Sequence, residues 1–251
     1  TQILLHHSAR QLRQQTAEQQ ALLRILCHDL RNPVAAVSSI LELINDNPEE
    51  IPELLPLAGC SIQSALELIQ HVRDFRNLID AGQSYAAERV SVTKAFQEVL
   101  TINHPRAREK GVGIKQEIDG DPHLVINRVV LVHNILNNLV SNAIKFSESG
   151  STLFLRARHL EENPDIIQLQ VEDSGIGMDA ATVKHLFDPE KNRSREGTGK
   201  ETGLGFGMPL VKRYLDLFHG RIEIDSRPGS ASPEDGGHGT RVDLYLPGSP
   251  H

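Results

Sequence analysis

The stretch NNLVSNAIKF, residues 137–146, contains amide side chains and a lysine among apolar residues. Asn134, Asn138 and Asn142 recur every four residues and Lys145 follows, so one α-helix over about 128–146 would carry them on one face. The other positions are mostly Val, Leu, Ile and Ala, which predicts that the helix is otherwise buried. Buried amides cost desolvation free energy unless a polar group meets them. A metal-bound polyphosphate would do so, with amide oxygen on Mg²⁺ and lysine on phosphate; a hydrogen-bonded network of core amides is the alternative.

The segments on both sides of this helix predict an α+β domain. Residues 152–158 and 166–173 alternate as antiparallel strands do, across the turn EENPD. A helix over 209–218 is expected to end at Gly220. The remaining predicted elements are a helix at 93–103 and strands at 112–118, 221–226 and 240–246.

The motif DSGIGM, residues 173–178, follows one of these strands. Asp173 shares the parity of Ile167 and Leu169, so its carboxylate is predicted to point toward the core side. Such a carboxylate needs a donor, and the exocyclic amine of a nucleobase would serve. Gly175 and Gly177 would let a flat ligand approach the backbone closely. An ordinary Asp-Ser-Gly turn is the alternative.

A second glycine motif, TGLGFGMPLVK at 202–212, places Gly203, Gly205 and Gly207 ahead of a helix. The backbone N–H groups of such a loop, together with the helix N-terminus, favour phosphate. The polar segment 188–202 before it is expected to form a lid over the ligand.

The N-terminal part has a different pattern. Apolar residues step by threes and fours through 21–46 and again from Leu54 to Ile79, with the interruption NDNPEE at 45–50. This spacing predicts two amphipathic helices that form a hairpin. Because one hairpin cannot cover its own apolar stripe, a dimeric four-helix bundle is expected. The predicted organisation is a helical lead-in at 1–20, the hairpin at 21–82, a hinge at 83–89, and an α/β sandwich at 90–248 with a mixed sheet and helices on one face.

The stretch HDLRNP, residues 28–33, lies within the first helix of this hairpin. His28 falls roughly opposite the apolar stripe, so it is predicted to face solvent. For an isolated histidine this is an ordinary surface position. The alternative is a nucleophile that its neighbours assist, with Pro33 bending the helix just after the site.

Composition excludes several classes of protein. The chain has 251 residues and a net charge of −7, without the basic stripe of a nucleic-acid binder. Cys27 and Cys60 do not form a CxxC pair, which favours a reducing compartment. No apolar run reaches the roughly 20 residues needed to cross a bilayer, so no membrane contact is expected within this stretch. We expect a cytoplasmic location, either as a soluble sensor or as the cytoplasmic part of a longer, membrane-anchored one.

Taken in order, these motifs resemble those of a sensor histidine kinase of a two-component system, over residues 20–247. HDLRNP is similar to the phospho-acceptor box, NNLVSNAIKF to the Asn box, and DSGIGM and GLGFGM to the two glycine boxes. LFDP, residues 186–189, is similar to the Phe box, although only Phe187 of the usual pair is present. Phe206, Met208 and Pro209 also depart from the family pattern, without removing a predicted ligand.

The resemblance implies a role for each matching residue. His28 would be phosphorylated beside Asp29 as the neighbouring base, and Asn32 would position water for dephosphorylation of the partner. ATP and Mg²⁺ are the implied cofactors, with Asn142 as the metal ligand. The other implied nucleotide-site residues are Asn138, Lys145, Asp173, Gly175, Gly177, Phe187, Gly203, Gly205 and Gly207.

The resemblance implies a homodimer that passes the phosphoryl group to an aspartate of a separate response regulator, because no receiver-like pattern follows residue 247. Three alternatives stay open: a non-catalytic regulator, a phosphatase-dominant kinase, and an ATP-driven clamp of the gyrase or heat-shock type. The clamp would not need His28.

Overall fold

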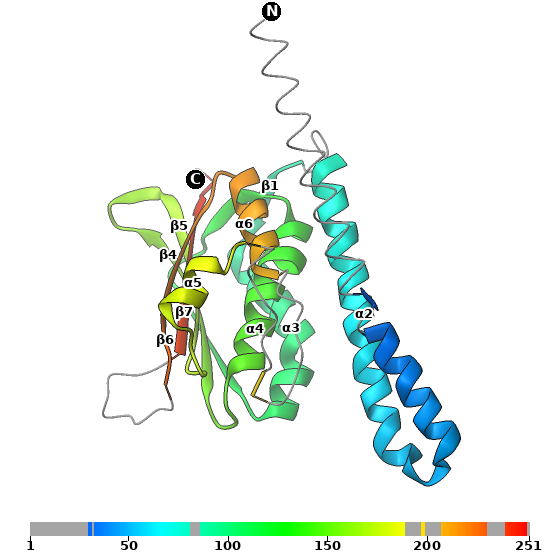
Figure 1. Ribbon diagram of the computed structural model, residues 1–251. Coiled ribbons are helices and arrows are strands. Elements are labelled where there is room, and N and C mark those ends of the chain that lie inside the picture. The colour runs from blue at the N-terminus through cyan, green and yellow to red at the C-terminus, as the bar shows by residue number, and fades with distance from the viewer. Residues whose placement is uncertain are drawn as a thin grey trace, which may run out of the picture. The chain divides into compact units, whose positions relative to one another are not determined.

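The computed structural model describes residues 30–31, 33–80, 86–188, 197–198, 207–229 and 239–249 (Figure 1). The chain divides into two compact units, Thr1–Arg73 and Asp74–His251, and each is described by itself. In the described part of the chain, no helix is both long enough and apolar enough to cross a membrane.

The first unit contains most of the predicted helical hairpin, whose second helix continues beyond Arg73 into the second unit. Residues 33–46 are helical, a 3₁₀ turn η1 covers Pro48–Glu50, and α2 runs over Ile51–Asp80. Pro48 lies at the start of η1, where its missing N–H costs no helical hydrogen bond, so the first helix ends before it.

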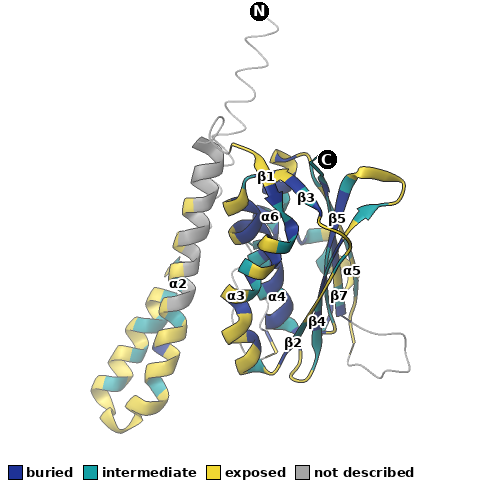
Figure 2. Ribbon diagram, turned by 180° about the vertical axis from the view of Figure 1, so that it is seen from behind, coloured by how far each residue is buried: buried dark blue, intermediate teal, exposed yellow. Residues whose placement is uncertain are grey.

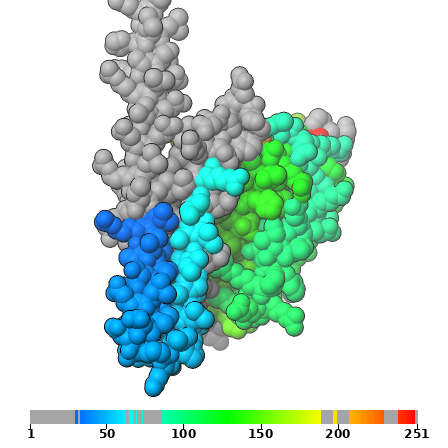
Figure 3. Space-filling model, turned by 90° about the vertical axis from the view of Figure 1, so that its right-hand side faces the viewer, coloured from blue at the N-terminus to red at the C-terminus, as the bar shows by residue number. Residues whose placement is uncertain are grey.

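The described surface of the hairpin, drawn blue to cyan in Figure 3, is rich in uncovered apolar side chains. Figure 2 shows that most of the hairpin's described residues are exposed or half-buried and that hardly any are buried. The exposed apolar residues are Val34, Leu41, Leu43, Ile51, Leu55, Leu57, Ile62, Leu66 and Ile69.

The second unit is built on a five-stranded mixed sheet in the order β2-β4-β5-β7-β6. β2 runs parallel to β4, and all other neighbours are antiparallel. A separate two-stranded sheet pairs β1 with β3. The strands are β1 Glu88–Ser91, β2 Gly113–Ile118, β3 His123–Ile126, β4 Thr152–Leu160, β5 Asn163–Asp173, β6 Arg221–Arg227 and β7 Gly239–Pro247.

Helices cover one face of the large sheet, and the core lies between the two layers (Figures 1 and 2). Alternation in β4 and β5 turns residues such as Leu153 and Ile167 inward, where both are fully buried. The helices are α3 Val92–Lys110, a π-helical segment η2 Val130–Leu136, α4 Asn137–Phe146, α5 Ala180–His185 and α6 Gly207–Leu217. The predicted α+β class, with a helical N-terminal part followed by a mixed sheet and helices on one face, is confirmed. The predicted domain boundaries stay predictions. Residues 81–82 of the predicted hairpin and 83–85 of the predicted hinge lie outside the described residues.

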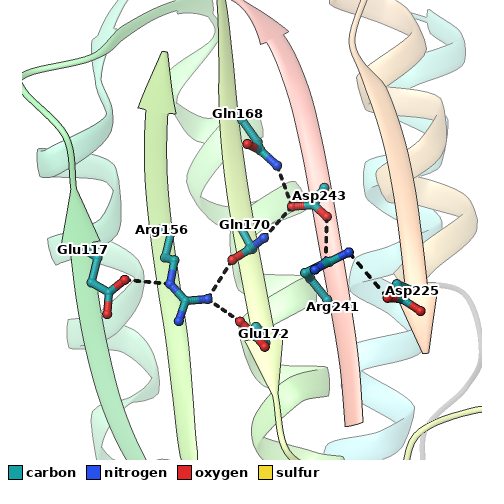
Figure 4. Close-up of polar contacts among 8 residues, drawn as sticks. All are labelled: Glu117, Arg156, Gln168, Gln170, Glu172, Asp225, Arg241 and Asp243. Carbon is teal, nitrogen blue, oxygen red and sulfur yellow. Dashed lines mark hydrogen bonds and ion pairs between the residues drawn. The ribbon is translucent and has the colours of Figure 1, made fainter. Parts of the chain in front are cut away.

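The opposite face of the sheet carries a polar network that crosses all five strands (Figure 4). At its centre, the Asp243 Oδ1 atom accepts hydrogen bonds from Nε2 of Gln168 and of Gln170, both at 2.8 Å. The Nε atom of Arg241 lies 3.1 Å from the other oxygen of the same carboxylate. Asp243 is only 6% exposed, so these donors replace the water that its charge has lost.

Replacing Asp243 with Ala is expected to lower the free energy of unfolding by about 3 kcal/mol, because two amides and a guanidinium lose a buried partner. Urea denaturation measures this loss. Asp225→Ala is the matched control, since Asp225 contacts the same Arg241 at 3.4 Å but is exposed. The control should lose less than about 1 kcal/mol. Equal losses for the two variants would contradict this account of the network.

Candidate functional site

The helix that carries the asparagines is not one continuous α-helix. Residues 130–136 form a π-helix, closed by a hydrogen bond from the Asn137 N–H to the Val132 carbonyl, and α4 begins at Asn137. A π-helix bonds i to i+5, so its turn is wider than that of an α-helix. The prediction of one continuous α-helix over about 128–146 is therefore wrong, whereas the side chains of Asn134 and Asn138 both face α6. Asn134 is buried, 8% exposed, and donates to the Tyr214 hydroxyl at 3.2 Å.

The amide of Asn138 lies between α4 and the first residue of α6. Its Nδ2 atom donates to the backbone carbonyl of Asn134 at 2.6 Å, which fixes the orientation of the amide. Its oxygen faces Gly207, where an added Cβ would lie only 2.7 Å from Oδ1. Glycine at 207 therefore keeps the Asn138 oxygen beside the N-terminus of α6, an end of a helix that favours anions.

Asn142 lies one turn further along α4 and is half-buried. Among the described residues its amide makes no hydrogen bond, and because the side chain is only half-buried, the amide stays open to water or a ligand. Amide oxygen is a ligand that Mg²⁺ accepts, and the pair Asn138 and Asn142 fits the donor set of a magnesium-bound phosphate.

The side chain of Lys145 is buried, whereas a lysine that contacts phosphate at the protein surface would be exposed. It is 7% exposed, and its ammonium lies 5.0 Å from the centroid of the Phe146 ring. Its backbone carbonyl accepts hydrogen bonds from the Lys110 ammonium and from the N–H and hydroxyl of Thr198. The Thr198 hydroxyl also donates to the Ser147 carbonyl at 2.6 Å, so this residue of the predicted lid segment is joined to the end of α4.

Asp173 ends β5 with the orientation that its parity predicts, because Leu169 and Val171 are buried on the same side. Its Oδ1 atom accepts hydrogen bonds from the N–H groups of Gly175, at 2.9 Å, and Thr240, at 3.3 Å. Two backbone donors from neighbouring segments therefore orient this carboxylate, which sequence analysis could not anticipate for Thr240.

The loop after Asp173 is held between two backbone segments. The N–H of Ile176 donates to the Phe146 carbonyl at 3.1 Å, and a Cβ added to Gly175 would lie 2.2 Å from that oxygen. On the other side, a Cβ added to Gly177 would lie 1.9 Å from the Arg227 carbonyl, and Gly177 has a φ of +62°. Both glycines are thus required by space, and Gly177 also by its left-handed backbone.

The structure brings together Asn138, Asn142, Lys145, Asp173, Gly175, Gly177 and Gly207 around α4. Phe187 is half-buried and packs against the same core. His28, Asp29, Asn32, Gly203 and Gly205 lie outside the described residues, so their roles stay predictions. Tyr214 and Thr198 were not identified from the sequence, because their partners lie far away in the chain and no motif indicates these contacts.

Two family models match the chain. Residues 18–79 match the His Kinase A (phospho-acceptor) domain, and residues 127–250 match the histidine kinase-, DNA gyrase B-, and HSP90-like ATPase. The second range contains every described residue of the site.

Relatives and solved structures agree with these matches. The sensor histidine kinase GacS of Pseudomonas protegens is 30% identical over 82% of this chain and 23% of its own length. ShkA, solved full-length in complex with AMPPNP, has a TM-score of 0.62 and 21% identity over 92% of this chain and 46% of that one. ThkA, solved in complex with the response regulator TrrA, has a TM-score of 0.68 and 16% identity over 99% of this chain and 67% of that one. The chain spans 23–25% of the length of the curated relatives that it matches.

Replacing Gly177 with Ala is expected to destabilise the protein through both strain and collision. The left-handed backbone alone costs about 1–2 kcal/mol for a residue with a Cβ, and displacement of the Arg227 carbonyl adds about 1–3 kcal/mol. Gly120→Ala is the matched control, because Gly120 has a similar φ of +70° with nothing within 4 Å of an added Cβ. Urea denaturation of both variants separates the two terms. If they lose the same free energy of unfolding, the close approach at Gly177 is not a real constraint.

Proposed function

This chain belongs to the sensor histidine kinases, and we propose that it transfers the γ-phosphoryl group of ATP to its own His28 and then to an aspartate of a separate response regulator. The observation that carries the proposal is the joint placement of Asp173 and the α4 asparagines in a chain that also matches the phospho-acceptor domain. A cytoplasmic location is proposed on the same family grounds.

The arrangement of donors and acceptors supports ATP as the ligand. The carboxylate of Asp173, oriented by two backbone N–H groups, is suited to accept from the adenine amine. The α4 amides and the N-terminus of α6 are suited to the phosphates at the other end of the nucleotide. AMPPNP in the related ShkA structure is an ATP analogue, which supports the same ligand class here.

The proposed transfer uses the two nitrogens of His28 differently. The lone pair on Nε2 attacks the γ-phosphorus, the bond from that phosphorus to its bridging oxygen breaks, and ADP leaves with the electron pair. The Nδ1–H is retained and donates to the Asp29 carboxylate, which holds the tautomer with a free Nε2. Such transfers depend mainly on positioning and charge stabilisation.

Asn142 is the residue that would hold Mg²⁺, and Asn138 would assist at the phosphates. When bound, the ion offsets the negative charge of the phosphate oxygens. Asn138 is held in place by the Asn134 carbonyl, so it can bind without losing much side-chain freedom.

The phosphoryl group is proposed to leave His28 for an aspartate of a receiver domain. The complex of the related ThkA with the regulator TrrA supports this class of partner. We also propose that the hairpin removes the phosphoryl group from the regulator, with Asn32 positioning the attacking water. This second activity is supported by the sequence of HDLRNP alone.

Incubation with γ-labelled ATP and Mg²⁺ tests the transfer. We expect label on the protein that is labile in acid and stable in base, and its complete loss in His28→Ala, because the nucleophile is gone. His104→Ala, an exposed histidine on α3, is the control and should label normally. Label that persists in His28→Ala would refute the assignment, and binding of ATP without any labelling would favour the clamp or the non-catalytic regulator.

The exposed apolar side chains of the hairpin support a homodimer. Leu55, 61% exposed, is expected to be covered by the partner hairpin, so Leu55→Glu should shift the protein from dimer to monomer in analytical ultracentrifugation. Leu217→Glu is the control, since Leu217 on α6 is also exposed, at 44%, but lies in the second unit. A dimer that survives Leu55→Glu and dissociates in Leu217→Glu would place the interface elsewhere.

A further inference from the structure

The helical segment formed by η2 and α4 is joined to α6 by two contacts, one at Asn134 in η2 and one at Asn138 in α4. The first is the hydrogen bond from Asn134 Nδ2 to the Tyr214 hydroxyl, between side chains that are 8% and 1% exposed. The second is the close approach of the Asn138 oxygen to Gly207, at the start of α6. Tyr214 lies about two turns after Gly207 on the same helix.

These contacts form a closed ring through both helices. Asn134 binds Tyr214 with its side chain and Asn138 with its backbone carbonyl, the latter at 2.6 Å. α6 then connects Tyr214 back to Gly207, which faces the Asn138 oxygen. Figure 1 shows α4 and α6 next to each other in the helical layer, in agreement with this ring.

The ring lies where the π-helical segment η2 passes into α4. Asn134 is in η2 and Asn138 is in α4, and both side chains meet α6. π-helical turns are found frequently at functional sites.

We propose that Tyr214 is a positioning residue for the phosphate end of the nucleotide, an inference that rests on the proposed ATP binding. Its hydroxyl holds α6 in one register on η2, and this register sets the distance between the Asn138 oxygen and the N-terminus of α6. Both groups face the phosphates, whereas the base end is bound by Asp173 on β5. Loss of the Tyr214 hydroxyl therefore weakens phosphate binding and leaves base binding unchanged.

The test compares the dissociation constants of ATP and of adenosine, both measured by calorimetry in the presence of Mg²⁺. Tyr214→Phe keeps the ring and removes the hydroxyl. We expect its ATP dissociation constant to rise about tenfold, equivalent to about 1.4 kcal/mol, with the adenosine constant within twofold of wild type. Asn134→Leu removes the donor from the other side and should give the same selective loss, so the test stands if one variant does not fold.

Asn103→Leu is the matched control. Asn103 is 4% exposed and donates to the Asn137 side chain at 2.8 Å, so it joins the same helix to α3 instead of α6. It should lose stability in urea denaturation while its ratio of ATP to adenosine affinity stays at the wild-type value.

The possible outcomes separate this inference from the proposed function. Wild-type protein that binds no ATP refutes the proposed function itself. Wild-type protein that binds ATP, with Tyr214→Phe and Asn134→Leu unchanged for both ligands, refutes only the role of Tyr214. Equal weakening of ATP and adenosine, or the same selective loss in Asn103→Leu, would show a general effect of destabilisation and also refutes it.

Discussion

The contact between the Phe146 carbonyl and the loop after Asp173 is the constraint on which the site depends. The Ile176 N–H bonds that carbonyl directly, and Gly175 leaves no atom between the two backbones. Because Gly177 meets the Arg227 carbonyl on the other side, the loop cannot move away from α4 without colliding with that carbonyl. The carboxylate at the end of β5 and the amides of α4 are therefore kept at one spacing, as a ligand with a polar group at each end requires.

Elements with strong periodicity could be predicted from the sequence. The alternation in β4, β5 and β7 and the spacing in α6 are long enough to distinguish strand from helix. β1 and β3 have four residues each, too few for an alternating pattern to stand out, and both were missed. α5 was missed for the same reason, and its N-terminus depends on Asp179 accepting from Thr182 N–H. The π-helical turn in η2 has no sequence signature, because apolar residues fit either helix.

The parts of the site that depend on residue type and local backbone geometry could be predicted from the sequence. The parity of β5 gave the correct side for Asp173. The close approach of Gly207 to Asn138 was not predicted, because it depends on how α6 packs on α4. Contacts between segments far apart in the chain could not be predicted. Thr240 N–H on Asp173, Thr198 on the Lys145 carbonyl and Tyr214 on Asn134 each depend on how whole elements pack. Where such a contact forms, it replaces the simple role suggested by spacing, as at Asn134.

β2 can lie parallel to β4 only because the chain between them, residues 119–151, crosses over the sheet before it returns. That crossover contains η2 and α4, so the helix that carries Asn138 and Asn142 is also part of the connection between an edge strand and its neighbour. Melting this helix would release β2 and open the core to water, which makes local unfolding there nearly as costly as global unfolding. The candidate site residues on this helix are therefore held by the same packing that holds the edge of the sheet.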